Sequence, residues 1–125
     1  MMRLGAFIAI LLVNSTTLAA VSSDCWVLRK RGQERESQAC FEQLTRSGYA
    51  AVRAEGFWGL EEWDRANEQF RLANQSTNSQ PQIKVRWGML LHERFNNKDA
   101  ADLFREALAK DPANANAYLG LAINS

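Results

Sequence analysis

The sequence predicts an all-α protein in which antiparallel helix hairpins stack into a solenoid. Three residues recur, with the same identities, 34 positions further on: Ala66, Phe70 and Ala73 return as Ala100, Phe104 and Ala107. Their spacing of i, i+4 and i+7 places a small, a large and a small side chain on one face of a helix, which a second helix can approach closely. A period of this length is typical of helical repeat proteins.

The first element along the chain is a predicted export signal. Arg3 supplies a positive start, residues 5–13 are apolar, and small and polar residues follow. The apolar stretch is shorter than the roughly 20 residues that a membrane-spanning helix needs, and the order of these features is that of a secretory signal. The candidate cleavage positions follow small residues: Ala19, Ala20 and Ser22. We interpret residues 1–22 as a signal peptide; the alternative is that residues 5–13 form a buried core helix.

Residues 23–125 form the predicted repeat domain, with about three hairpins and a partial one. The expected units are residues 23–46, 47–80, 81–114 and the partial 115–125. The first unit aligns with the second only if the offset shrinks to 29, because Ser37, Phe41 and Leu44 precede Ala66, Phe70 and Ala73 by that number. This unit is degenerate, as terminal repeats often are.

The second and third units each begin with a helix that carries a small and a large residue at the 34-residue offset. The small residues are Ala54 and Gly88, and the large ones are Phe57 and Leu91. We expect this first helix to lie against the stripe of the second helix in the same unit. Arg53 departs from the pattern, since it occupies a slot that is otherwise large and apolar.

Capping residues delimit the last helices. Residues 96–99 offer side chains that can cap the helix carrying Ala100, and Asp111 precedes Pro112, which disfavours helical geometry there. Asn114 can cap a further helix over residues 115–123. No second helix follows it. Unless this helix caps the solenoid, we therefore expect its apolar side chains to be exposed and available for self-association: Tyr118, Leu121 and Ile123.

The third unit resembles the tetratricopeptide repeat family. The residues that carry the resemblance are Trp87, Gly88, Leu91, Ala100, Phe104, Ala107 and Pro112. The resemblance implies a protein that binds a protein or peptide partner through a concave groove and is not an enzyme. Because one fold serves many functions, the resemblance does not name the partner.

The family resemblance also implies which side chains line the groove. Phe57 is expected in the core, whereas Trp58 is expected to face the groove. The implied partner-binding residues are Ala51, Glu55, Trp58, Val85, Met89, His92 and Glu93. This mixture suits an apolar or mildly basic segment, because tryptophan and methionine are enriched at interfaces.

Composition and motifs argue against other kinds of site. After the signal is removed, the 15 basic residues fall by one to 14, which balances the 14 acidic residues. We therefore expect no nucleic acid partner and read the basic run of residues 29–35 as a solvated helix end. One histidine and two cysteines argue against a zinc site, and no cofactor motif is present. Glu61, Glu62 and Asp64 are interpreted as favourable charges at a helix start rather than as a catalytic pair.

The two cysteines lie almost equally far from Gly32, in the predicted first hairpin. Cys25 precedes the glycine by seven residues, and Cys40 follows it by eight. Exported proteins often form disulfides, and closing a loop of about 15 residues is worth roughly 3 kcal/mol in the chain-entropy model. The alternative is that Cys25 fills a small slot and Cys40 stays reduced.

Together these features predict an exported interaction scaffold, in the bacterial periplasm or secreted, without stable membrane insertion once the signal is cleaved. An alternative function is that the chain is the docking region or a fragment of a larger exported enzyme, such as a hydrolase.

Overall fold

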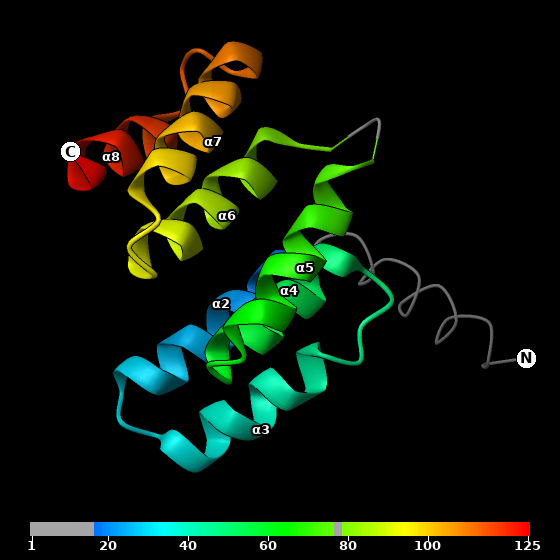
Figure 1. The fold of residues 1–125 in the computed structure, drawn as a ribbon. Coiled ribbons are helices and arrows are strands. Elements are labelled where there is room, and N and C mark those ends of the chain that lie inside the picture. The colour runs from blue at the N-terminus through cyan, green and yellow to red at the C-terminus, as the bar shows by residue number, and fades with distance from the viewer. Residues whose placement is uncertain (1–16, 77–78) are drawn as a thin grey trace, which may run out of the picture.

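A computed structural model describes residues 17–76 and 79–125, and these residues form helices without strands (Figure 1). The helices are α2 (Thr17–Lys30), α3 (Glu34–Leu44), α4 (Ala50–Gly59), α5 (Trp63–Asn74), α6 (Pro81–Glu93), α7 (Asn97–Lys110) and α8 (Ala115–Asn124). The all-α prediction is therefore confirmed for the described part of the chain.

The predicted signal peptide lies mostly outside the described residues, including its apolar stretch at residues 5–13. Helix α2 begins at Thr17 and so runs through all three candidate cleavage positions. The expected boundary at residues 22/23 falls within this helix rather than before it.

Successive helices pack against each other along the chain, and α2 also contacts α4 while α6 contacts α8. The hairpin of α2 and α3 and the helix α8 lie at opposite ends of the molecule (Figure 1). Short turns join α2 to α3, α4 to α5, and α6 to α7. In each of these three pairs the two helices contact each other.

The three hairpin turns share one backbone geometry. A residue with positive φ occupies the same place in each: Gly32 (φ 77°), Glu61 (φ 62°) and Phe95 (φ 64°). In each turn the next residue donates its backbone N–H to the carbonyl five residues earlier: Gln33 to Leu28 (3.0 Å), Glu62 to Phe57 (2.9 Å) and Asn96 to Leu91 (2.8 Å). This is the Schellman ending of a helix. The turns are separated by 29 and 34 residues, the same offsets as the sequence stripes.

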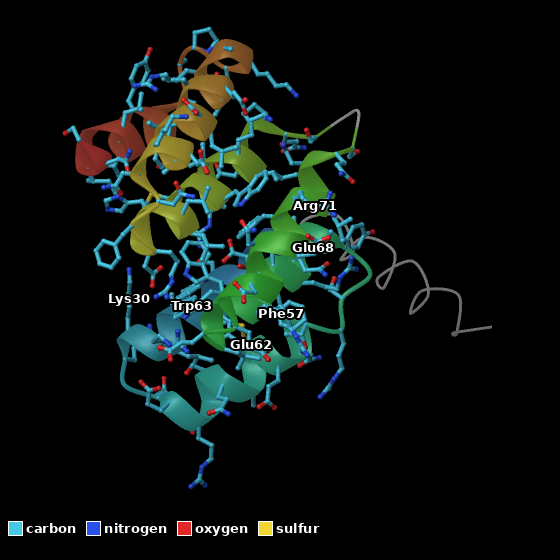
Figure 2. All side chains as sticks on the ribbon, viewed as in Figure 1. Lys30, Phe57, Glu62, Trp63, Glu68 and Arg71 are labelled. Carbon is cyan, nitrogen blue, oxygen red and sulfur yellow. A yellow bond between two sulfur atoms is a disulfide. The ribbon has the colours of Figure 1, made fainter. Side chains whose placement is uncertain are left out.

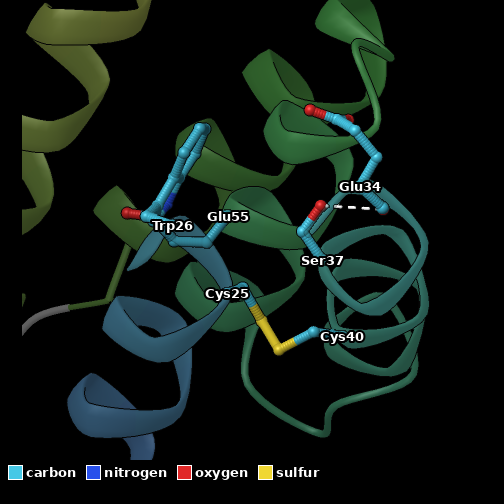
Figure 3. Close-up of a disulfide and its surroundings, with 6 residues drawn as sticks. All are labelled: Cys25, Trp26, Glu34, Ser37, Cys40 and Glu55. Atoms are coloured by element: carbon cyan, nitrogen blue, oxygen red, sulfur yellow. Dashed lines mark hydrogen bonds between the residues drawn. A yellow bond between two sulfur atoms is a disulfide. The ribbon is translucent and has the colours of Figure 1, made fainter. Parts of the chain in front are cut away.

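The predicted stripes form the core. Phe41, Phe70 and Phe104 are among the largest fully buried side chains. The small residues beside them are also buried: Ser37, Ala66, Ala100 and Ala107. Ala73 is only half-buried, because it lies near the end of α5. The buried Ser37 satisfies its hydroxyl by donating to the Glu34 carbonyl at 2.9 Å (Figure 3).

Glycines allow the phenylalanine rings to contact the backbone of a neighbouring helix. A Cβ atom at Gly59 would lie 2.2 Å from the ring of Phe41. A Cβ atom would lie 2.6 Å from the ring of Phe104 at Gly88 and 2.4 Å from it at Gly120. Phe104 is therefore held between α6 and α8 at positions that accept no side chain.

A disulfide joins Cys25 on α2 to Cys40 on α3 (Figure 3). The two Cα atoms are 5.4 Å apart, which lies within the range that a disulfide requires. Cys25 is fully buried beside Phe41 and Leu44. Of the two alternatives that the spacing left open, the structure has the bridged one.

Asparagine side chains cap the last two helices, α7 and α8. Asn96 accepts the backbone N–H of Asp99 at 3.4 Å, and Asn114 accepts that of Ala117 at 3.0 Å, as predicted. On α8, Tyr118 and Ile123 are exposed as expected. The prediction for Leu121 is wrong, because it is half-buried against the cluster around Phe104. Leu119 is exposed instead.

Candidate partner-binding surfaces

A network of polar and aromatic side chains joins α2, α4 and α6. Glu55 of α4 accepts the indole N–H of Trp26 from α2 at 2.9 Å. The same carboxylate accepts two hydrogen bonds from Arg86 of α6, at 2.6 and 2.9 Å. We call Trp26, Glu55, Trp58, Arg86 and Glu93 the inner network. One mostly buried carboxylate thus links three helices that are far apart in the sequence.

Trp58 is the centre of this network, and its predicted place outside the core is wrong. Its side chain is only 6% exposed. Its ring makes edge contacts with Trp26, at 5.3 Å between centroids, and with Phe70, at 6.1 Å. The Arg86 guanidinium lies 4.4 Å from its centroid, and its indole N–H donates to Glu93 at 2.7 Å. Phe57, which was expected to be in the core, is half-buried at its edge.

The other predicted groove residues are also engaged within the chain. Val85 is buried in the cluster around Phe104, and Met89 is half-buried between two clusters. A ring nitrogen of His92 lies 2.9 Å from the side-chain oxygen of Asn124 on α8. Ala51 is half-buried. Six of the seven predicted groove residues therefore take part in contacts between helices: Glu55, Trp58, Val85, Met89, His92 and the exposed Glu93, which accepts the Trp58 hydrogen bond.

Sequence reasoning missed Trp26 and Arg86. The signal for Trp26 was present, because it precedes Glu55 by the same 29 residues that relate the first unit to the second. Extending the groove positions to the first unit would have found it. Arg86 has no such signal, since its role depends on how α6 lies against α4.

A second surface is an open groove between α5, α6 and α7, which we call the outer groove. Its volume is about 590 Å³. Its apolar lining comes from Trp63, Trp87, Leu90, Leu91 and Leu103. Four carboxylates line it as well: Asp64 from α5, and Asp99, Asp102 and Glu106 from α7. Aromatic rings and acidic groups are therefore combined in one hollow.

Both tryptophans of the outer groove are half-buried and held in place. The indole N–H of Trp87 donates to the Asn67 side chain at 2.7 Å. The guanidinium of Arg94 lies 4.6 Å from the centroid of the Trp63 ring, in the range of a cation–π contact. Figure 2 shows Trp63 at the beginning of α5.

The outer groove is electrostatically negative. Four lining carboxylates less the one lining guanidinium give a formal charge of −3. Asp102 pairs with Lys98 at 3.7 Å and with Arg105 at 3.4 Å, while Glu106 pairs with Lys84 at 3.4 Å. These cations do not line the groove, and their carboxylate partners are more than half exposed, so each pair contributes little, about 0–1 kcal/mol.

Other surface features are modest by comparison. On α5, Glu68 and Arg71 point to solvent (Figure 2), and the side-chain hydrogen bond from Arg71 lowers the pKa of the Glu68 carboxyl. Both side chains are exposed, so the pair is screened by water.

Across residues 17–76 and 79–125, no histidine, cysteine and carboxylate groups gather as metal ligands would. No helix in the same ranges is long and apolar enough to cross a membrane. The features that stand out are thus a filled inner network and an open, acidic and aromatic outer groove.

No protein-family model matches the chain, and a search of curated proteins finds no match.

Proposed function

We propose that this protein is an exported helical-repeat module of tetratricopeptide type that binds a segment of another protein. The recurrence of the buried stripe supports the repeat part of the proposal, as does the shared Schellman turn at Gly32, Glu61 and Phe95. Hairpins that repeat in this way build extended surfaces, which repeat proteins use for binding.

The observation that carries the binding proposal is the outer groove. Trp63 and Trp87 are only half-buried there, and tryptophan is enriched among residues that dominate binding energy. The groove is open between three helices, so a chain can lie along it without displacing core side chains. The inner network contrasts with it, because Trp58 is covered and its indole N–H is already bonded to Glu93.

The experiment is affinity capture from the native extracytoplasmic fraction with charge-reversed variants. The groove variant Asp64→Lys/Asp102→Lys changes two exposed acids that line the groove. The control variant Glu36→Lys/Glu42→Lys changes two exposed acids of α3, away from the groove, by the same total charge.

We expect the wild-type protein and the control to capture the same partner proteins and the groove variant to lose them. Circular dichroism should show equal helix content in all three proteins. Capture that survives in the folded groove variant would contradict the assignment of this surface.

The export part of the proposal has its own test. We expect the protein recovered outside the cytoplasm to begin after Ala19, Ala20 or Ser22, as read by N-terminal sequencing. Leu11→Arg places a charge in the apolar stretch and should keep the chain inside the cell and uncleaved. Recovery of an intact N-terminus on the exported wild-type protein would contradict cleavage.

A further inference from the structure

We infer that the outer groove recognises an arginine side chain of the partner segment, and that Arg94 occupies the same site in the free protein. This inference rests on the proposed function and deepens it, because it names the chemistry of the partner. It commits to a basic, partly apolar segment of another protein.

Arg94 lines the groove from the end of α6. Its guanidinium lies 4.6 Å from the centroid of the Trp63 ring. A guanidinium is planar and weakly hydrated, so it stacks on an indole better than an ammonium does. The ring of Trp63 therefore already presents a face to a cation of this shape.

Carboxylates from two different helices line the groove. Asp64 projects from α5, whereas Asp102 and Glu106 come from α7, where they are four residues apart and share a helix face. The guanidinium fork donates several hydrogen bonds and matches carboxylates geometrically. The lining has a formal charge of −3. Asp102 and Glu106 also pair with Lys98, Arg105 and Lys84 outside the groove, but these surface pairs are weak and a carboxylate can accept further hydrogen bonds from a partner arginine.

Leucine side chains also line the groove. Leu90 and Leu103 are buried beneath the groove, and Leu91 is half-buried. A segment made only of charged residues would leave Leu91 and the ring of Trp87 uncovered. The matching segment alternates arginine with apolar residues, so that the cations meet the carboxylates while the apolar side chains cover these two half-buried side chains.

The arrangement makes Arg94 a competitor of the partner. Replacing it with glutamine frees the Trp63 face and changes the formal charge of the lining from −3 to −4. The variant Arg94→Gln should therefore bind an arginine segment more tightly, by about 3-fold, the scale of one exposed cation–π contact. A purely structural role for Arg94 would give weaker binding instead.

The test is fluorescence anisotropy with a labelled peptide that alternates arginine and leucine. Matched peptides carry lysine or the neutral isostere citrulline in place of arginine. We expect the arginine peptide to bind about 10-fold more tightly than the citrulline peptide, with lysine between them. Its affinity should fall as salt rises, because exposed charges are screened.

The variant Asp102→Asn/Glu106→Gln removes two charges at nearly constant shape and should weaken arginine-peptide binding by about 10-fold, since each exposed pair is worth at most about 1 kcal/mol. The control Glu36→Gln/Glu42→Gln should leave it unchanged. Equal effects of both double variants would show a general charge effect and overturn the site.

The same binding measurements distinguish a wrong arginine inference from a wrong proposed function. If citrulline and arginine peptides bind equally and both lose binding in Trp87→Ala, the groove binds polypeptides but the arginine inference is wrong. If no peptide binds, the proposed groove function fails as well. If sedimentation shows self-association without peptide, which Asp102→Asn/Glu106→Gln abolishes, a second copy is the occupant, and the partner-protein inference is overturned.

Discussion

The first and third hairpins reach the same local geometry by different means. Both contain a fully buried phenylalanine, Phe41 on α3 and Phe104 on α7, and both end their first helix with the same turn. In the third hairpin the ring meets Gly88. In the first hairpin the corresponding position is Cys25, which is covalently joined to the facing helix.

The difference teaches that two hairpins can end their first helix in the same way, although a covalent bond joins the helices of one and a glycine contact joins the helices of the other. A disulfide that closes a loop of 15 residues restricts the unfolded chain, and the chain-entropy model assigns about 3 kcal/mol to this effect. The third hairpin depends instead on the absence of a side chain at a point of contact. The two hairpins should therefore respond differently to substitution and to reductant.

The largest expected decrease in the free energy of unfolding follows from removing a buried phenylalanine ring. Phe104→Ala and Phe41→Ala should each lower the free energy of unfolding by about 3–5 kcal/mol, because each leaves a cavity in a fully buried site. Urea unfolding followed by circular dichroism measures this change. Leu72→Ala, on the exposed side of α5, is the control and should cost far less. A small effect at Phe41 alone would show that the first hairpin is held mainly by its bridge.

The second-largest expected change is the stability lost when the disulfide between Cys25 and Cys40 is removed. The variant Cys25→Ala/Cys40→Ala should lose about 3 kcal/mol of stability, because its unfolded chain is no longer restricted. Reductant should weaken the wild-type protein to a similar extent and leave the variant unchanged. Equal urea midpoints for the oxidised wild-type protein and the variant would refute the compensating role of the disulfide.

The third effect concerns the glycines by which the next helix contacts the phenylalanine ring of each hairpin, Gly59 on α4 and Gly120 on α8. Gly59→Ala and Gly120→Ala improve helix propensity, yet each places a Cβ atom within 2.4 Å of a buried phenylalanine ring. We expect overpacking to win and lower stability by about 1–3 kcal/mol in each case. Gly48→Ala adds a Cβ atom to open space and should be nearly neutral. Stabilisation by Gly59→Ala or Gly120→Ala would contradict the tight contact.

The smallest expected change in stability comes from substitutions at the positive-φ residues of two hairpin turns, Gly32 and Phe95. Gly32→Ala should cost about 1 kcal/mol, because alanine is disfavoured at positive φ. Phe95→Gly should stabilise the protein by up to about 1 kcal/mol, since Phe95 adopts positive φ and is 87% exposed. Differential scanning calorimetry on both variants measures the opposite signs. A lower melting temperature for Phe95→Gly would mean that its ring has a stabilising contact.

The sequence predicted the parts of the structure that depend on local period. The stripes around Phe70 and Phe104 were identified from their spacing, because a helix places i, i+4 and i+7 on one face. The same arithmetic found Phe41 once the offset was shortened. Positive φ at Glu61 and Phe95 was not predicted, since neither residue type favours it.

The site was predicted less well than the fold, for a physical reason. Trp58 was assigned to a groove by family resemblance, but this chain surrounds its ring with Trp26, Phe70 and Arg86. The outer groove arises from the relative placement of three helices, which no local spacing encodes. Trp63 and Trp87 were therefore visible in the sequence, whereas the hollow between them was not.

The chain contains four tryptophans, and they divide evenly between the two surfaces. Trp26 and Trp58 belong to the inner network, while Trp63 and Trp87 line the outer groove. Indole N–H groups give separate signals in a ¹⁵N-correlated NMR spectrum, so each surface reports independently on the same titration.

The most direct measurement is that spectrum recorded while the arginine–leucine peptide is added. We predict that the signals of Trp63 and Trp87 shift with the peptide concentration and that those of Trp26 and Trp58 stay in place. Shifts confined to Trp26 and Trp58 would contradict the account, because they would place the partner on the inner surface.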